Sequence, residues 1–466
     1  MNKTVLASLL LASGATLAFG QTQTVEDRVM TSRATQAVIW AMPAVNTDLM
    51  LQAALKTGAK ENEIVYWSRP VDWRNQTLTP NPDAIYLMPF FNTKHAPIVL
   101  EVPPATSDSS FTGNIDDIWQ MPLEDAGPAG ADKGAGGKYL ILPPGYKGKL
   151  PAGYIVLRSP TYSGYALIRS TLRSRSEADV ANAVAYGKRL KLYALADAAH
   201  PPATRFTDAA NQLFDATIPY DTRYFESLSR IVQNEPWLER DKVMIDQLKS
   251  IGIEKGKPFA PDEQRRKKLD QAALDARDWI AHELERAYTP YFPGARWVVP
   301  AAQALVQDAS KGYSEPDIYP VDARALVYSM GYVGIKRLGE GQFYLLSWQD
   351  KNGGALDGSH HYRLTVPQNA PVRQYWSVTV YDHDTHALIR NMTRASRSSQ
   401  STDMVKNADG STDIFFGPDV PAGHEKNWIP TERGEKFELL FRAYQPARPL
   451  FDKTWTLPDP VKVDAS

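Results

Sequence analysis

Cysteine is absent from this sequence of 466 residues. Its absence excludes disulfide bonds, thiolate zinc sites and a thiol nucleophile, so the hydrophobic core must supply the stability. A surplus of either charge is also missing, because 52 basic residues stand against 53 acidic ones. Proteins that bind nucleic acid usually carry a concentrated basic surplus, so we expect no nucleic-acid partner.

Long hydrophobic runs are missing except at the N-terminus. Lys3 precedes an apolar stretch from Val5 to Leu17, and Ala18-Phe19-Gly20 supplies small residues at the positions that signal peptidase recognises. The stretch is shorter than the roughly 20 apolar residues that a membrane span needs. We therefore predict a signal peptide over residues 1–20, cleavage after Gly20, a periplasmic or secreted protein, and no integral membrane span after signal removal.

The common catalytic motifs are also missing. The nearest match to a phosphate-binding loop, Gly136-Gly-Lys-Tyr139, has tyrosine where the Ser or Thr hydroxyl belongs, and no serine stands in a Gly-x-Ser-x-Gly motif. His282-Glu-Leu-Glu-Arg286 has arginine in place of the second zinc-binding histidine. The run from Asp382 to His386 fits either a metal site or a solvated hairpin end, and the hairpin is the simpler interpretation. We expect no metal and no cofactor.

The chain alternates between helical and strand-like patterns. A helical pattern over residues 21–60 contains Pro43, which we expect to kink or split the helix because proline has no amide donor. Short apolar runs separated by Pro and Gly predict strands over residues 61–198 and again over 336–466. Residues 199–335 are again helical. We predict an α+β protein with two β-sandwich, jelly-roll-like domains, a helical N-terminal segment and a helical connector.

Several motifs, taken in order, resemble a known pair of bacterial domains. In the first half these are Asn81-Pro-Asp-Ala-Ile-Tyr86, Pro97–Pro103, Ile115-Asp-Asp117 with Trp119, Gly137-Lys-Tyr-Leu140 and Pro144-Gly145. In the second half they are Leu356-Asp-Gly358, Tyr362, Tyr375-Trp-Ser377, Tyr381, Asn407, Asp409-Gly-Ser411, Asn427-Trp-Ile-Pro430, Arg442-Ala-Tyr444 and Pro446. The first set resembles the domain of unknown function numbered 1254, and the second set resembles its usual partner, numbered 1214. The resemblance implies two β-sandwiches with helical additions and leaves the activity open.

The polar and aromatic positions within these motifs are the candidate site residues. A cleft between the two domains, lined by aromatic rings and a few polar groups, would suit an amphipathic small molecule. The candidate ligand-binding residues are Tyr86, Trp119, Asn427, Trp428, Arg442 and Tyr444. A structural alternative exists for the polar ones, since Asn427 can bind loop backbone and Arg442 can pair with a carboxylate.

Three aspartates are the candidate catalytic residues. Glycosidases use one carboxyl group of raised pKa beside a second that stays ionised, and Asp116-Asp117 or Asp83 could supply such a pair. The alternative is that these carboxylates order turns.

Three functions remain open at this stage. The first is an exported protein of uncharacterised activity that binds a small organic or carbohydrate ligand in an aromatic interdomain cleft. The second is a hydrolase of ester or glycosidic bonds that uses carboxylates. The third is a structural or interaction protein of the cell envelope.

Overall fold

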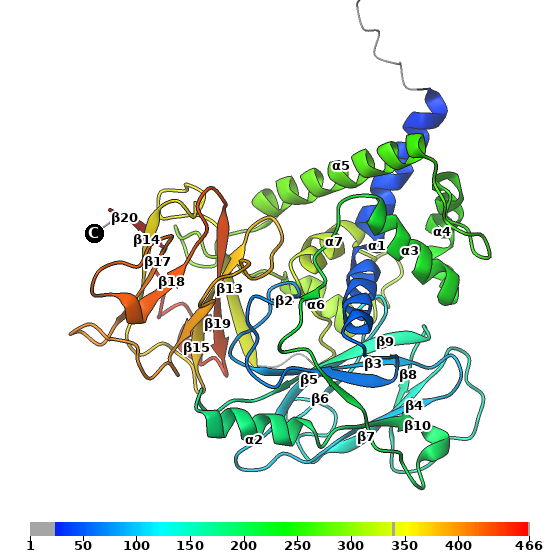
Figure 1. Ribbon diagram of the computed structural model, residues 1–466, viewed down its shortest axis with the longest axis horizontal. Helices are drawn as coiled ribbons and strands as arrows, with labels where there is room; N and C mark the ends of the chain where they lie inside the picture. The colour runs from blue at the N-terminus through cyan, green and yellow to red at the C-terminus, as the bar shows by residue number, and fades with distance from the viewer. Residues whose placement is uncertain (1–23, 338–340, 465–466) are drawn as a thin grey trace, which may run out of the picture.

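The computed structural model describes residues 24–337 and 341–464 (Figure 1). The predicted signal peptide over residues 1–20 lies outside the described residues. Two layered β domains lie side by side, and a group of helices packs against both of them (Figure 1).

The first β-sandwich consists of two sheets packed on a common core. One sheet has the order β11-β1-β3-β9-β5-β6 and the other β10-β4-β7-β8. Alternate residues such as Leu87, Ile98, Leu100 and Ile141 form the hydrophobic core that the two sheets share. The strands are β1 (Glu63–Tyr66), β3 (Ile85–Asn92), β4 (Ile98–Val102), β5 (Phe111–Asp117), β6 (Pro122–Ala126), β7 (Gly137–Leu142), β8 (Ile155–Arg158), β9 (Ser163–Ser170), β10 (Lys191–Ala194) and β11 (Phe206–Asp208).

The second β-sandwich follows the same plan with two four-stranded sheets, β13-β19-β15-β16 and β18-β17-β14-β20. Val378, Leu439 and Phe441 from one sheet share a core with Leu364 and Ile414 from the other. The strands are β13 (Gln342–Ser347), β14 (His361–Val366), β15 (Trp376–Asp382), β16 (Ser396–Ser398), β17 (Thr412–Gly417), β18 (Trp428–Pro430), β19 (Phe437–Tyr444) and β20 (Val461–Val463). The predicted α+β class with two β-sandwich domains is confirmed, and the jelly-roll detail stays a prediction.

Helices α3, α4, α5 and α7 pack around α1 (Val25–Lys56) and form one helical body with it, whereas α2 packs on β3 and β9 of the first sandwich. The last turns of α1 lie on the outer face of the first sheet, where Met50 and Ala54 pack with Met88 and Phe90. The other helices are α2 (Glu177–Gly187), α3 (Thr222–Asn234), α4 (Lys242–Leu248), α5 (Glu263–Ala287), α6 (Gln303–Ser310), α7 (Val321–Ser329) and α8 (Arg448–Phe451), with 3-10 turns η1 (Leu195–Asp197), η2 (Glu239–Asp241), η3 (Lys249–Ile251) and η4 (Glu425–Asn427).

Helix α1 runs through Pro43 without a break, so the expectation that Pro43 splits it was wrong. A proline inside a helix costs about 3 kcal/mol because one backbone hydrogen bond is lost. Every residue from Ala37 to Asp48 is buried, so packing on both sides of the proline offsets that cost. Helix α1 is also the described helix that is long and apolar enough to cross a membrane, but 78% of its apolar window is buried inside the protein.

The first sheet extends past residue 198, where the sequence places the start of the connector. Strand β11 pairs in parallel with β1, and a short pair joins β12 (Phe214–Asp215) to β2 (Asn75–Gln76). The apolar pattern of these two- and three-residue strands is too short to read from the sequence, because pairing with a distant strand decides their structure.

Candidate functional site

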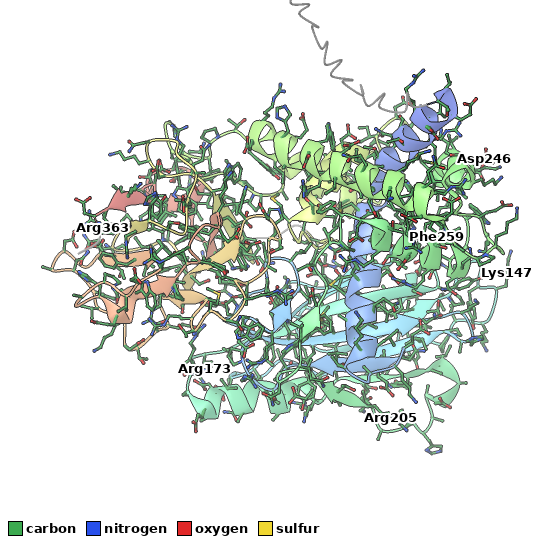
Figure 2. All side chains as sticks on the ribbon, turned by 45° about the horizontal axis from the view of Figure 1, so that its top comes forward. Lys147, Arg173, Arg205, Asp246, Phe259 and Arg363 are labelled. Carbon is green, nitrogen blue, oxygen red and sulfur yellow. The ribbon has the colours of Figure 1, made fainter. Side chains whose placement is uncertain are left out.

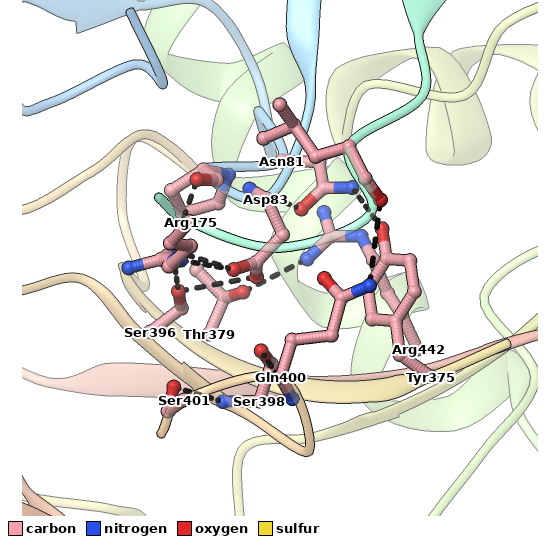
Figure 3. Close-up of polar contacts among 12 residues, drawn as sticks. Asn81, Asp83, Arg175, Tyr375, Thr379, Ser396, Ser398, Gln400, Ser401 and Arg442 are labelled. Carbon is pink, nitrogen blue, oxygen red and sulfur yellow. Dashed lines mark hydrogen bonds and ion pairs between the residues drawn. The ribbon is translucent and has the colours of Figure 1, made fainter. Parts of the chain in front are cut away.

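The polar face of strand β19 meets the first domain. Phe437, Leu439 and Phe441 point into the second sandwich, so alternation places Arg442 and Tyr444 on the opposite face. We call the contact between this face and the first domain the domain seam. Residues 79–83 of the first domain form the other side of the seam (Figure 3).

Arg442 fixes one end of the seam. Its side chain is 2% exposed and donates hydrogen bonds to Thr379 Oγ1 (3.0 Å), the Tyr381 hydroxyl (2.7 Å) and the Thr79 carbonyl (2.8 Å). The Tyr381 hydroxyl in turn donates to the Pro80 carbonyl at 2.6 Å. The carboxylate partner that the sequence suggested for Arg442 is replaced by neutral oxygens, so Arg442 holds the Thr79–Pro80 backbone in place.

Asn81 joins both domains in the middle of the seam. Its Nδ2 donates to the Tyr444 hydroxyl at 2.6 Å, and its backbone N–H donates to the Tyr86 hydroxyl at 2.9 Å. The Tyr444 ring stacks on Tyr375, with ring centroids 4.4 Å apart. Flanking prolines restrict this segment to extended conformations, which presents alternate side chains to the two domains.

Asp83 closes the other end of the seam. Its side chain is 1% exposed and pairs with Arg175 at 2.5 Å, while Ser396 Oγ donates to its second oxygen at 3.2 Å. Arg175 also donates to Ser396 at 3.1 Å (Figure 3). One carboxylate therefore ties β16 of the second domain to the segment before α2 of the first.

A cavity of about 60 Å³ lies directly behind residues 79–80. Its described lining comes from α1, residues 75–80, the outer face of the first sheet, the turn between β5 and β6, and the segment after α7: Asn46, Met50, Asn75, Thr77, Leu78, Thr79, Pro80, Tyr86, Met88, Gln120, Tyr165, Leu167, Arg169, Gly331, Tyr332 and Val333. We call it the seam cavity. Arg169 is the charged residue of this described lining, and its guanidinium lies 5.7 Å from the centre of the Tyr86 ring.

Asp116 and Asp117 lie beside the seam cavity but do not form a joint site. Asp117 Oδ1 accepts hydrogen bonds from the backbone N–H groups of Trp119 (2.8 Å) and Met121 (2.9 Å). Asp117 therefore orders the turn after β5, as the structural alternative for these aspartates states. Burial raises the pKa of Asp117 to about 6. Asp116 lies opposite Tyr165 on the neighbouring strand and is fully buried.

Asp116 is an unusual group for a protein interior. Neither of its oxygens has a hydrogen-bond partner among the described residues. Burial, reinforced by the nearby charges of Asp125 and Asp117, raises the pKa of Asp116 well above its ordinary value. Burial therefore favours the uncharged form of this carboxyl group.

The structure brings together some of the predicted site residues and separates the rest. Tyr86, Arg442, Tyr444 and Asp83 meet at the seam, and Tyr86 also lines the seam cavity. Trp119 packs on Trp40 in the helical body, with ring centroids 4.8 Å apart. The three candidate catalytic aspartates point to separate surroundings, so the hydrolase alternative gains no geometric support.

Asn427 and Trp428 lie on the far sheet of the second sandwich. Asn427 Nδ2 donates to the carbonyls of Val405 and Asp413, both at 2.7 Å, and Trp428 Nε1 donates to the Gly417 carbonyl at 3.0 Å. Both side chains therefore hold loops of their own domain, as the structural alternative for Asn427 states.

Histidines 383 and 386 converge on one buried carboxylate. His386 Nδ1 lies 3.0 Å and His383 Nδ1 lies 3.5 Å from the two oxygens of Glu438, which is 1% exposed. Glu438 precedes Arg442 on the seam face of β19 by four residues. Within the described ranges, no group of three or more His, Asp or Glu side chains is arranged to hold a metal ion.

Arg169 is the site residue that the sequence analysis missed. The run Tyr165-Ala-Leu-Ile-Arg169 lies within residues 61–198, for which the sequence predicts strands, and its alternation places Tyr165, Leu167 and Arg169 on one face. A charged residue at the end of a strand face that otherwise carries tyrosine and leucine was the available signal, because charged residues are rarely buried without a partner.

Two family models match the chain, and together they cover about half of it. The model described as "Protein of unknown function (DUF1254)" matches residues 61–194, and "Protein of unknown function (DUF1214)" matches residues 341–448. The chain therefore belongs to the family of proteins that carry these two domains in tandem, which confirms the resemblance found in the sequence.

A solved structure supports the fold. The VPA0106 protein from Vibrio parahaemolyticus is 19% identical with a TM-score of 0.56, and the match covers 93% of this chain and 100% of that one. An uncharacterized protein from Burkholderia cenocepacia is 12% identical with a TM-score of 0.40, covering 94% and 95% of the two chains. None of the curated proteins matches this chain significantly.

Proposed function

We propose that this protein binds a small organic molecule in the seam cavity and acts as an exported binding or accessory protein. The observation that carries the proposal is a cavity of about 60 Å³ whose described lining combines one partly buried cation, Arg169, with tyrosines, amide and hydroxyl side chains, and apolar side chains. Ligand sites combine apolar surface with polar groups that fix the orientation of the ligand, and this cavity offers both.

The size of the cavity narrows the range of ligands. One water occupies about 10–15 Å³ by the same measure, so the cavity holds about four to six water-sized groups. A hexose has roughly twice that number of non-hydrogen atoms. A small organic molecule therefore fits the cavity better than a carbohydrate does.

The seam explains why the site would need both domains. Arg442 and Tyr381 of the second sandwich bind the carbonyls of Thr79 and Pro80, and those two residues form one wall of the cavity. The second domain thus holds Thr79 and Pro80, and with them one wall of the cavity, in place through hydrogen bonds. Rigid support of this kind keeps lining groups in place for a ligand.

A ligand screen with a cavity-filling variant tests this proposal. Small polar molecules of up to about six non-hydrogen atoms are screened by thermal shift, because binding to the native state raises the melting temperature. We expect hits with the wild type and with Leu150→Trp, which adds a tryptophan at an exposed site. Leu167→Trp, which fills the cavity, should abolish them, and hits that persist in folded Leu167→Trp would contradict the proposal.

Export is the second part of the proposal and rests on the sequence of residues 1–20. Lys3, the apolar stretch and the small residues before Gln21 support cleavage by signal peptidase. Mass spectrometry of the protein from the periplasmic fraction should give a mature chain that begins at Gln21. A chain that keeps Met1 and stays with the cytoplasm would refute export.

A further inference from the structure

We propose that the ligand of the seam cavity is a small monocarboxylate of about four to six non-hydrogen atoms, whose carboxylate binds Arg169. The size follows from the cavity volume of about 60 Å³ and the space that one water occupies. This inference rests on the proposed function, since it names the chemical class of the ligand for the same cavity.

The first argument is the charge of Arg169. An arginine side chain stays protonated in proteins, and a buried charge normally has a partner of opposite charge. Among the described residues, Arg169 forms no ion pair, and its Nη1 donates a long hydrogen bond to Asn114 Oδ1 (3.4 Å). The cavity therefore presents a cation whose charge an anionic ligand would neutralise.

The second argument is that the nearest acids do not neutralise Arg169. Asp116 faces the same side of the sheet, but neither of its oxygens has a hydrogen-bond partner among the described residues, and burial raises its pKa, which favours the uncharged form. Asp125 is occupied by the backbone N–H groups of Lys336 (3.2 Å) and Arg337 (2.6 Å) and by Asn114 Nδ2 (3.0 Å). Neither carboxyl group therefore pairs with Arg169, and its positive charge remains available to a ligand in the cavity.

The third argument is the supply of hydrogen-bond donors. The Tyr86 hydroxyl accepts the Asn81 N–H, which leaves its own proton free to donate. The Tyr332 hydroxyl lines the same cavity, is buried, and has no hydrogen-bond partner among the described residues. Arg169, Tyr86 and Tyr332 together offer donors, and a carboxylate is a group that only accepts.

The apolar part of the lining favours a carboxylate over phosphate. Met50, Leu78, Met88 and Leu167 line the cavity beside the polar groups. A short alkyl chain would pack on these side chains, whereas phosphate presents oxygen on every side and would leave several oxygens unpaired. A single guanidinium also matches one carboxylate, because its donors form a bidentate fork.

Titration calorimetry at constant ionic strength tests the inference. Acetate, propionate and lactate are compared with acetamide, propionamide and inorganic phosphate, using the mature full-length chain. We expect saturable binding of a carboxylate to the wild type and to Arg158→Gln, which changes an exposed arginine on β8. Arg169→Gln should weaken that binding roughly 10- to 100-fold, as expected for loss of a charged hydrogen-bond partner.

The other outcomes separate this inference from the proposed function. Equal binding of the amides, or of phosphate in preference to propionate, with no effect of Arg169→Gln, would overturn the carboxylate class and leave ligand binding intact. No binding of any of these molecules to the folded wild type would overturn both. If Arg169→Gln does not fold, Arg169→Lys carries the test, because it keeps the charge but loses the bidentate geometry and should weaken binding by an intermediate factor.

Discussion

Buried polar side chains, rather than apolar contacts alone, connect the two β domains at the seam. Asp83 is 1% exposed and forms an ion pair with Arg175. Arg173, two residues before Arg175, forms an ion pair with Asp108 in which both side chains are 62% exposed. The exposed pair of Asp108 and Arg173 contributes little to the stability of the fold, because both charges are solvated by water whether or not they are paired. In the pair at the seam, the carboxylate of Asp83 is removed from water. Loss of Arg175 would therefore leave this buried carboxylate without its charged partner.

Removing each arginine therefore has a different effect on stability. Arg175→Gln should lower the free energy of unfolding by about 1–3 kcal/mol, because Asp83 loses its charged partner while remaining buried. Arg173→Gln, the matched control, should change it by less than about 1 kcal/mol. Urea unfolding curves measure both values (Figure 2 labels Arg173 on the surface). Equal effects of the two variants would show that the seam pair adds no special stability.

The histidine pair on Glu438 makes stability depend on pH. Burial alone would raise the pKa of Glu438, but the charges of His386 and His383 lower it from 4.5 to about 2. Burial likewise disfavours charged His386, but Glu438, helped by Asp382 and Asp384, raises its pKa above the ordinary 6.5. Each partner thus stabilises the charged form of the other.

The sign of the pH dependence follows from these two shifts. A lowered carboxylate pKa stabilises the fold above pH 4.5, and this contribution is lost as the pH falls toward 2. A raised histidine pKa stabilises the fold below pH 6.5, and this contribution is lost as the pH rises through the folded-state pKa. The interaction is complete only between those two ordinary values.

His386→Gln exposes this dependence. The difference in melting temperature between wild type and His386→Gln should be largest between pH 4.5 and 6.5 and should shrink at higher and lower pH. His95→Gln, at an exposed histidine, is the control and should give only a small difference. A constant difference for His386→Gln across the whole range would mean that the pair does not form.

At the scale of single elements, the loop after β6 depends on one glycine. Gly127 has φ +99°, and a Cβ atom there would overlap the carbonyl of Phe111 on the neighbouring strand. Its N–H donates to Asp132 at 2.7 Å, and Asp132 also accepts from the Tyr139 hydroxyl at 2.8 Å. Asp132 therefore links the loop to β7.

Gly127→Ala should lower the free energy of unfolding by about 2–4 kcal/mol, from strained backbone plus steric overlap with β5. Gly145→Ala is the control, because Gly145 also has positive φ (+68°) but no atom lies within 4 Å of an added Cβ. Gly145→Ala should lower the free energy of unfolding by only about 1 kcal/mol. The comparison by urea unfolding separates overlap from backbone strain, and equal costs would show that β5 moves aside.

Elements with strong local patterns could be predicted from the sequence, and those defined by distant partners could not. The alternation of Phe437, Leu439 and Phe441 correctly assigns Arg442 to the opposite face of β19. Strands β2 and β12 have only two residues each and form through pairing with each other across more than a hundred residues. The continuity of α1 through Pro43 likewise depends on burial by other helices.

The candidate site was predictable only in part for the same reason. Tyr86, Arg442 and Tyr444 belong to sequence motifs and do meet at the seam. Trp119 and Asn427 belong to similar motifs, but their contacts serve the helical body and a loop. Arg169 carries no motif, and only the placement of α1 and residues 331–333 over the sheet shows that it lines a cavity.

At the scale of the whole molecule, the helical body and the second sandwich share one core. A single hydrophobic cluster contains Val38 of α1, Leu228 of α3, Ile280 of α5 and both sheets of the second sandwich, including Phe441. The polar seam then joins this unit to the first sandwich, whose outer sheet α1 also covers. Figure 1 shows α1 between the helices and the strands of the first domain.

Shared packing of this kind predicts cooperative unfolding. We expect one calorimetric transition, with the calorimetric enthalpy equal to the van't Hoff enthalpy, because neither sandwich can unfold without exposing helical core residues. The double variant Arg175→Gln/Arg442→Met, which weakens both ends of the seam, should broaden or split that transition. Two well-separated transitions in the wild type would show that the sandwiches are independent.

The most direct test of the central claim is a crystal structure of the mature protein soaked with propionate. The account predicts electron density for the ligand in the seam cavity, with its carboxylate within hydrogen-bond distance of Arg169 and its alkyl chain against Met88 and Leu167. Density for water alone, with Arg169 paired to a carboxylate of the protein itself, would contradict it.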